Sequence, residues 1–169
     1  MIDDDLLVAD GSGDEPLVPV RSAFETFYRA EHPAVLRLAL ALTGDSGLAE
    51  DHTQDAFTRL IDRFESLANP AGYVRTVLVN QVRTTHRRSM LGPRHAHLLY
   101  RDVALGEPTE VLDALAALPY RQRAVLVLRY WADWSERDIA DALGVRAGTV
   151  KSLAARALGR LRTQMEDKP

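Results

Sequence analysis

A break in the apolar repeat at residues 89–108 divides this chain of 169 residues into two parts. Gly92-Pro93 and Gly106-Glu107-Pro108 lie within the break, and such dipeptides end regular structure. Fully extended, a segment of this length would span about 70 Å. A loop of that length is unusual inside one compact domain, so the sequence predicts a flexible linker between two domains.

Both parts carry apolar residues at three- and four-residue spacing, and neither shows the alternation of a half-buried strand. The predicted fold is therefore all-α, with two small helical domains, the second a helix-turn-helix of four helices. The expected divisions are an acidic, disordered extension (1–20), a first domain (21–88), the linker (89–108), a second domain (109–163) and a tail (164–169).

The first domain should contain three helices. Ser22 and Glu25 form a capping box at the start of the first, and Pro33 should kink or break that helix near His32. Gly44 ends it. Its expected inward residues are Phe24, Phe27, Tyr28, Leu36, Leu38 and Leu42.

The second helix should start near Asp45 or Ser46, and Asn69-Pro70 is an N-cap followed by a first-turn proline that opens the third, which should run to about Arg88. The second helix places Leu48, Ala56, Phe57, Leu60, Ile61 and Phe64 on one stripe. The third should bury Tyr73, Val74, Val77, Leu78 and Val82.

In the second domain we expect helices at residues 110–118 and 121–132, followed by two helices around a tight turn. Ser135 with Asp138 resembles a capping box, and Gly144 occupies the position after a helix end where positive φ is needed. A last helix should start around Ala147. This is the helix-turn-helix plan, whose second helix lies in a DNA major groove. Its expected inward residues are Ile139, Ala140, Leu143, Val145, Val150, Leu158 and Leu161.

Charge is segregated along the chain. The first twenty residues carry six acids and no cation, so the remainder is positive although the net charge is −3. Residues 66–101 contain six arginines and no acid, and residues 142–165 contain five cations and no acid. Clusters of this kind are typical of nucleic-acid binding. The alternative for the second cluster is a basic helical hairpin that packs on protein. Residues on the outward face of the last helix, which would read duplex DNA, are Arg146, Thr149, Lys151, Ser152, Ala155, Arg156 and Arg160.

Several classes of function are excluded. The chain has no cysteine, so it offers no disulfide, thiolate metal site or cysteine nucleophile. No apolar run approaches the roughly 18 residues of a membrane span, and the acidic start is unlike a secretory signal. His95 and His97 lack a third ligand nearby, and no glycine-rich phosphate loop or nucleophile motif is present. We therefore expect no metal, no cofactor and no catalysis, in a cytoplasmic protein.

Three motif blocks occur in order across the linker: LAEDHTQDAFTRLIDRF, NPAGYVRTVLVNQVRTTHRR and LPYRQRAVLVLRYWADWSERDIADALGVRAGTVKSLAARALGRLR. Together they resemble bacterial RNA polymerase sigma factors of the extracytoplasmic-function (ECF) group, over about Ser22 to Arg162. The resemblance implies a monomer within the holoenzyme that binds core RNA polymerase, directs it to promoter DNA and promotes strand opening. Many such proteins are held inactive by an anti-sigma protein.

The resemblance also implies roles for particular residues. The helix containing Ala49–Phe57 would dock on polymerase, although a solvated face is the plain alternative and His52 departs from the apolar residue common there. The helix containing residues 73–88 would melt and read the minus-ten element, and the helix-turn-helix would read the minus-thirty-five element. The implied polymerase-binding residues are Asp51, Gln54, Asp55, Arg59 and Asp62. The implied minus-ten residues are Asn80, Arg75, Arg83, Arg87 and Arg88, with the short segment before Asn69.

Two other functions remain open at this point. A stand-alone helix-turn-helix regulator would dimerise through its first domain and read two related half-sites, whereas a sigma factor reads two unlike elements as a monomer. A protein-interaction adaptor would show no salt-dependent DNA binding at all.

Overall fold

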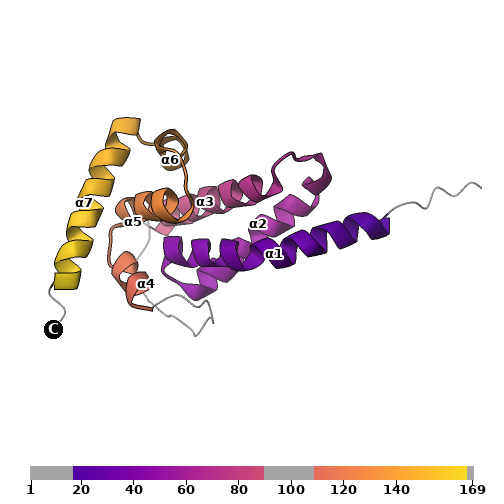
Figure 1. Ribbon diagram of the computed structural model, residues 1–169, viewed down its shortest axis with the longest axis horizontal. Helices are drawn as coiled ribbons and strands as arrows, with labels where there is room; N and C mark the ends of the chain where they lie inside the picture. Colours follow the sequence, from indigo (N-terminus) through magenta and orange to yellow (C-terminus); the bar gives the residue numbers. More distant parts are fainter. Residues whose placement is uncertain (1–16, 90–108, 167–169) are drawn as a thin grey trace, which may run out of the picture.

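The computed structural model describes residues 17–89 and 109–166, whose regular secondary structure is all helical, without a strand (Figure 1). The disorder predicted for residues 1–20 does not hold at residues 17–20, which begin α1. Residues 1–16, the linker from residue 90, the His95–His97 pair and the tail from residue 167 lie outside the described residues. The helices are α1 (Leu17–Thr43), α2 (Ser46–Ile61), the 3₁₀ turn η1 (Phe64–Ser66), α3 (Pro70–Ser89), α4 (Thr109–Ala116), α5 (Tyr120–Leu126), the π-helical turn η2 (Val127–Trp131), α6 (Glu136–Leu143) and α7 (Ala147–Glu166).

The first helix differs from its prediction at its start and at Pro33. It begins at Leu17, five residues before the proposed cap at Ser22, and Pro19 lies in its first turn, where a backbone N–H has no helical partner. Pro33 does not break it. Pro33 is exposed, while Val35 and Leu38 beyond it are buried, so packing holds the helix together despite the missing hydrogen bond. Of the expected inward residues, Tyr28 is 37% exposed.

The second helix starts where the sequence indicates. Asp45 is its N-cap, and its carboxylate accepts a hydrogen bond of 2.8 Å from the Leu48 N–H. The predicted stripe is wrong at two positions, because Leu48 is 40% and Ile61 53% exposed. The buried residues next to Leu48 and Ile61 are Ala49 and Leu60, each one position away. The buried face of α2 consists of Ala49, Thr53, Ala56, Phe57 and Leu60, with Ser46 in the first turn.

The start and the buried face predicted for the third helix are confirmed. It begins at Pro70, and the Asn69 side chain accepts from the Gly72 N–H at 2.9 Å. Val74, Leu78 and Val82 are buried, and Tyr73 and Val77 pack at the edge of the core. Val79, which the sequence analysis left out, is also buried at 1% exposure, on a face that meets the second half of the chain.

The C-terminal half has the four-helix plan expected from the sequence, with η2 continuing α5 as a wider turn. The last helix corrects one expected core position, since Leu158 is 44% exposed. Buried residues on α7 follow the spacing of one helix face, and Leu158 lies one residue beyond it. The buried positions are Val150, Leu153, Ala154 and Ala157.

The turn before α7 depends on a single glycine. Gly144 is the C-cap of α6 with φ 63° and ψ 43°, the left-handed region that residues with a Cβ adopt at a cost. The Val145 N–H then donates to the Ala140 carbonyl at 3.0 Å, which closes the helix end and redirects the chain into α7.

We expect Gly144→Ala to lower the free energy of unfolding by about 1–2 kcal/mol, because the new side chain must adopt left-handed backbone angles. Gly159→Ala is the matched control: a Cβ there meets nothing within 4 Å, so it should stabilise α7 by roughly 0.5–1 kcal/mol. Urea unfolding of both variants measures the difference. Effects of equal sign would contradict the role assigned to Gly144.

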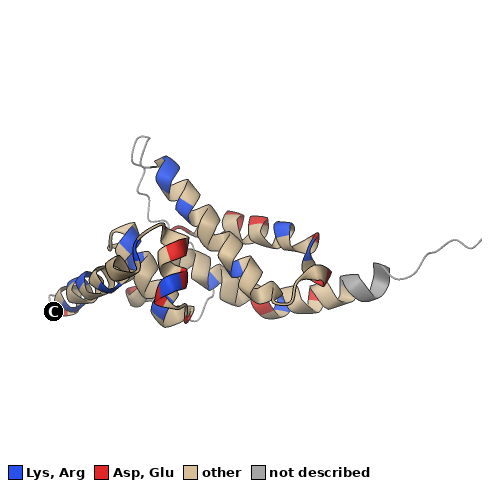
Figure 2. Ribbon diagram, turned by 90° about the horizontal axis from the view of Figure 1, so that it is seen from above, with Lys and Arg blue, Asp and Glu red and all other residues tan. Residues whose placement is uncertain are grey.

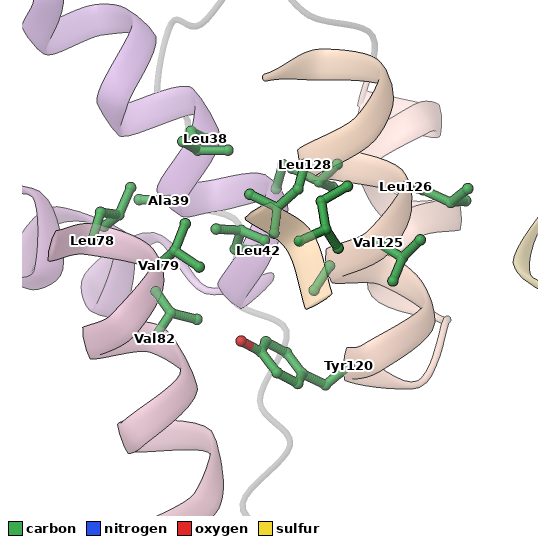
Figure 3. Packing of buried hydrophobic residues seen from close by; sticks show 14 of the residues in the cluster. Leu38, Ala39, Leu42, Leu78, Val79, Val82, Tyr120, Val125, Leu126 and Leu128 are labelled. Carbon is green, nitrogen blue, oxygen red and sulfur yellow. The ribbon is translucent and has the colours of Figure 1, made fainter. Parts of the chain in front are cut away.

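The two halves are not separate bodies in space. The helix α1 lies against α4, α5 and η2, and α3 lies beside α6 and contacts α5 through His86 and Tyr120 (Figure 1). Leu42 of α1 and Leu128 of η2 are both fully buried in one shared apolar cluster (Figure 3).

Candidate nucleic-acid interface

The helix-turn-helix is built from a capped first helix and a glycine turn. The Ser135 hydroxyl accepts from the Asp138 N–H at 3.1 Å and donates to the Asp138 carboxylate at 2.5 Å. Ile139 and Ala140 face the core of this unit, and Val150 of α7 is fully buried between the helices. This geometry fixes which face of α7 points outward.

That outward face of α7 carries the predicted duplex-reading residues. Arg146, Lys151, Ser152, Ala155, Arg156 and Arg160 are exposed, and Thr149 is half-buried in the first turn. Between residues 142 and 165 no acid interrupts the cations, and Figure 2 shows them spaced along the helix that ends at the C-terminus. The structure thus brings all seven predicted residues to one helix or its immediate start.

Two of these side chains are held by neighbours. Arg156 donates to the Ser152 carbonyl at 3.1 Å and to its hydroxyl at 3.3 Å, so the guanidinium lies along the helix one turn back. Lys151 lies 3.7 Å from the Glu136 carboxylate, which also binds Arg129 at 2.8 Å. These contacts are solvent-exposed or half-exposed and can be exchanged for phosphate contacts.

Three of the five predicted minus-ten residues are exposed, and the other two bind groups on other helices. Asn80, Arg87 and Arg88 are exposed on α3. Arg75 forms an ion pair with Glu31 of α1 at 2.9 Å, and Arg83 donates to the Ala142 carbonyl of α6 at 2.7 Å. In this structure, the guanidinium groups of Arg75 and Arg83 therefore bind other groups of the same chain.

The short segment before α3 combines a half-buried aromatic anchor, Phe64, with exposed residues. The Phe64 ring packs edge-on against Phe24, with centroids 5.4 Å apart, and against Phe27 at 5.2 Å. Glu65 and Ser66 are exposed, while the Asn69 amide oxygen is used as the cap of α3. The segment presents exposed polar groups from a fixed backbone.

The predicted polymerase-binding residues form one polar surface on α2. Asp51, Gln54, Asp55, Arg59 and Asp62 are all exposed at helical spacing. His52, beside them, is half-buried; burial lowers the pKa of its imidazole, and the carboxylates of Asp55 and Asp51 oppose that shift. The α2 surface therefore carries three carboxylates with a neutral histidine at its edge.

The polar residues between the two helical units were not predicted from the sequence. Arg123 is 9% exposed within the apolar run RAVLVL, and it donates to the carbonyls of Leu42 at 3.0 Å, Ala116 at 3.1 Å and Thr43 at 3.4 Å. The signal available in the sequence was the cationic Arg123 next to an apolar run, since a charged residue in such a place needs a partner. The His86 ring stacks on Tyr120, with centroids 4.1 Å apart, and burial raises the pKa of the Tyr120 hydroxyl to about 12.

Within residues 17–89 and 109–166, no three His, Cys, Asp or Glu side chains are grouped as metal ligands. Among the same residues, no helix is long and apolar enough to cross a membrane.

Family models match both halves of the chain. The model described as Sigma-70 region 2 covers residues 27–90, and the model described as Sigma-70, region 4 covers residues 109–161.

Two similar proteins agree with these matches. The chain is 35% identical over 155 residues to an RNA polymerase sigma-E factor of Streptomyces avermitilis, covering 86% of each chain. It is 33% identical to the ECF RNA polymerase sigma factor SigL of Mycobacterium tuberculosis, covering 81% of this chain and 86% of that protein.

Solved structures show the same fold. The sigma factor RpoE in complex with the anti-sigma factor NepR from Bartonella quintana matches with a TM-score of 0.65 at 23% identity, over 88% of this chain and 99% of that one. CnrH in complex with the cytosolic domain of CnrY matches with a TM-score of 0.61 at 20% identity, over 88% of this chain and 91% of that one.

Proposed function

The chain belongs to the ECF group of bacterial RNA polymerase sigma factors, and on that premise we propose which of its surfaces performs each step of initiation. As a sigma factor it directs polymerase to promoters, and it is not a stand-alone helix-turn-helix regulator. The family consists of transcription initiation factors; we propose that this member works in the cytoplasm without catalysis or a cofactor, as a monomer in the holoenzyme.

The exposed surface of α2 is the proposed polymerase-docking surface. Its charged side chains project from a helix whose opposite face is anchored by Phe57 and Leu60. A rigid helix that presents Asp51, Asp55 and Asp62 suits a partner surface with complementary cations, since such pairs steer association and fix register.

The proposed minus-ten surface is the exposed side of α3 together with the Phe64–Asn69 segment. Arg87 and Arg88 would follow the phosphate backbone, and the Asn80 amide offers donors and an acceptor to an unstacked base. Arg75 and Arg83 join this surface only once their present partners are released.

The exposed face of α7 is the proposed reader of the minus-thirty-five duplex. The observation that carries this assignment is the left-handed turn at Gly144, which sets α7 against α6 with its cations outward. Residues near the start of α7 would meet base edges, and those further along would meet phosphates.

The two kinds of contact predict different mutant behaviour. Arg156→Ala should cost about 1–3 kcal/mol and relax specificity at one upstream base pair, as expected for a lost base-edge contact. Arg162→Ala should weaken binding evenly across sequences and reduce the salt slope by roughly one. Fluorescence anisotropy on a set of single-base variants separates the two. Equal, sequence-independent losses would mean that Arg156 contacts only phosphate.

Run-off transcription tests the whole assignment. Purified chain and core polymerase are incubated with fragments of the source genome, and start sites are mapped. We expect transcripts that depend on the chain and share two upstream elements. Transcripts whose starts share no upstream element would contradict the assignment of α3 and α7 as promoter-reading surfaces.

Control by an anti-sigma protein is a further proposal. Among the structural relatives named above, RpoE was solved with the anti-sigma factor NepR, and CnrH was solved with the cytosolic domain of CnrY. Their identity to this chain is below 25%, so they support the fold and leave the partner to be found by co-purification.

A further inference from the structure

A polar groove runs between α2 and α3, the helices that carry the proposed polymerase-docking and minus-ten surfaces. These two helices pack side by side (Figure 1). The groove has a volume of about 400 Å³, which is within the range of sites for small molecules and cofactors. The lining residues that matter here are His52, Asp55 and Arg59 of α2 and Asn80, Gln81 and Arg88 of α3.

Three polar atoms beside the groove have no hydrogen-bond partner among the described residues: Nε2 of His52 and both amide atoms of Gln81. All three are covered by neighbouring atoms, and an unpaired covered polar atom lowers the stability of a fold. Both residues are half-buried as a whole, so a rotation about the outer bonds of either side chain brings its polar end into the groove. Native folds retain such atoms where a ligand or a water satisfies them. The groove therefore offers a donor and an acceptor from Gln81 and a ring nitrogen from His52.

Two arginines lie at the edges of the groove, one on each helix. Arg59 of α2 and Arg88 of α3 are exposed, and neither forms an ion pair within residues 17–89 and 109–166. A guanidinium binds a phosphate through two parallel hydrogen bonds. Asp55 is the one carboxylate that lines the groove in the described part of the chain, so the cations exceed it. Polar walls with cationic edges suit a ligand that joins a planar polar group to a phosphate.

The Asp55 carboxylate narrows the choice of planar group. A carboxylate accepts hydrogen bonds, and adenine, cytosine and guanine each carry an exocyclic amino group that donates one. Thymine and uracil have no such group. The Gln81 amide, with a donor and an acceptor side by side, also matches the edge of a base. The groove therefore favours a base with an amino group.

We propose that the groove between α2 and α3 is a nucleotide-binding site, in which a base contacts Gln81 and His52 and its phosphate binds Arg59 or Arg88. The same chemistry is present in a base of the melted non-template strand and in a free nucleotide. For the strand, the inference rests on the proposed function, since the strand would reach the groove past Asn80 of the minus-ten surface. Base recognition is then shared by α3 and by His52 of the polymerase-docking helix.

The strand is tested with holoenzyme and a fluorescent oligonucleotide of the non-template minus-ten strand, from which one base at a time is removed. With the wild-type chain, loss of the base in the groove should weaken binding by about tenfold. With Gln81→Leu, loss of that base should have no further effect while the effects at the other positions persist, as a double-mutant cycle requires for a direct contact. His52→Leu, on the opposite wall, should cancel the same position and serves if the Gln81 variant fails to fold.

Urea unfolding of Gln81→Leu tests a purely structural role. Because the amide has no partner within the described residues, a leucine of similar volume should leave the unfolding midpoint unchanged or raise it. A clear fall in the midpoint would show that the amide is satisfied inside the fold and would overturn the assignment. Gln122→Leu on α5 is the matched control, since it also removes a covered amide oxygen that has no partner in the described part of the chain. It should bind the oligonucleotide as the wild type does.

Asn80→Ala in the same series separates this inference from the proposed function. If it cancels the effect of one base and neither groove variant cancels any, the strand does not enter the groove. If Asn80→Ala cancels none, the minus-ten assignment of α3 fails instead.

A free nucleotide is tested by equilibrium dialysis of the full chain against AMP, CMP, GMP and UMP. Binding that Gln81→Leu and His52→Leu abolish, and that is weakest for UMP, would support the groove as the site of a free nucleotide. The proposal is overturned if none of these nucleotides binds and the groove variants cancel no base of the strand.

Discussion

Replacing Asp55 and Asp62 together by lysine should weaken binding to core RNA polymerase by on the order of 2 kcal/mol or more, roughly thirtyfold. Both carboxylates are exposed on the same side of α2, and reversal turns two attractive contacts into repulsive ones. The helix itself should persist, because its buried stripe is untouched. Pull-down of core polymerase, with circular dichroism as the check on folding, measures both expectations.

A matched control separates a docking surface from a general effect of charge. Glu25→Lys with Asp113→Lys makes the same change in net charge at exposed positions of α1 and α4. This control should bind polymerase nearly as well as the wild type. If both double variants lose affinity equally, long-range charge explains the result and α2 is not the docking helix.

Helix boundaries that depend on local chemistry were predictable from the sequence. The helix start near Asp45, the caps at Asn69 and Ser135 and the turn at Gly144 are confirmed, because a side chain or a backbone angle within four residues decides each of them. The helix-turn-helix followed from these signals and from the apolar spacing on either side.

Features that depend on packing were predicted less well. The break expected at Pro33 does not occur, since the half-buried Phe27 before the proline and the buried Val35 and Leu38 after it all pack on the core and hold α1 continuous. Leu48, Ile61 and Leu158 were assigned to the core for their apolar character, yet each lies one position away from the face that its neighbours bury. Apolar periodicity predicts the helix. Which of two adjacent apolar residues is buried depends on the helix that packs against it.

The contacts between the two helical units could not be predicted from the sequence. Arg83 and Arg123 bind carbonyls that lie 59 and 81 residues away, and backbone acceptors leave no trace in residue type. The resemblance to ECF sigma factors implies a DNA contact for Arg83. In the structure, the Arg83 guanidinium instead donates to the Ala142 carbonyl of α6.

The Asn80 side chain gives the last prediction. Asparagine has low helix propensity, so a plain surface position on α3 would more naturally hold Arg, Glu or Gln. The residue is exposed, which removes the alternative of an amide buried and satisfied in the core. Asn80→Ala should therefore lower open-complex formation on duplex promoters by about 2–3 kcal/mol, roughly a hundredfold, through loss of contacts to a flipped base. Binding of the minus-thirty-five duplex should be unaffected.

Permanganate footprinting on two templates distinguishes base capture from other defects. A promoter pre-melted across the minus-ten region supplies the unpairing but not the missing amide, so it should rescue only part of the loss in Asn80→Ala. Thr84→Ala, exposed one turn along α3, is the matched control and should open both templates normally. Complete rescue on the pre-melted template would assign Asn80 to strand separation alone. Normal opening of the duplex by Asn80→Ala would remove the residue from the minus-ten surface and transfer base capture to the exposed groups of the Phe64–Asn69 segment, whose backbone the Phe64 ring fixes against Phe24 and Phe27.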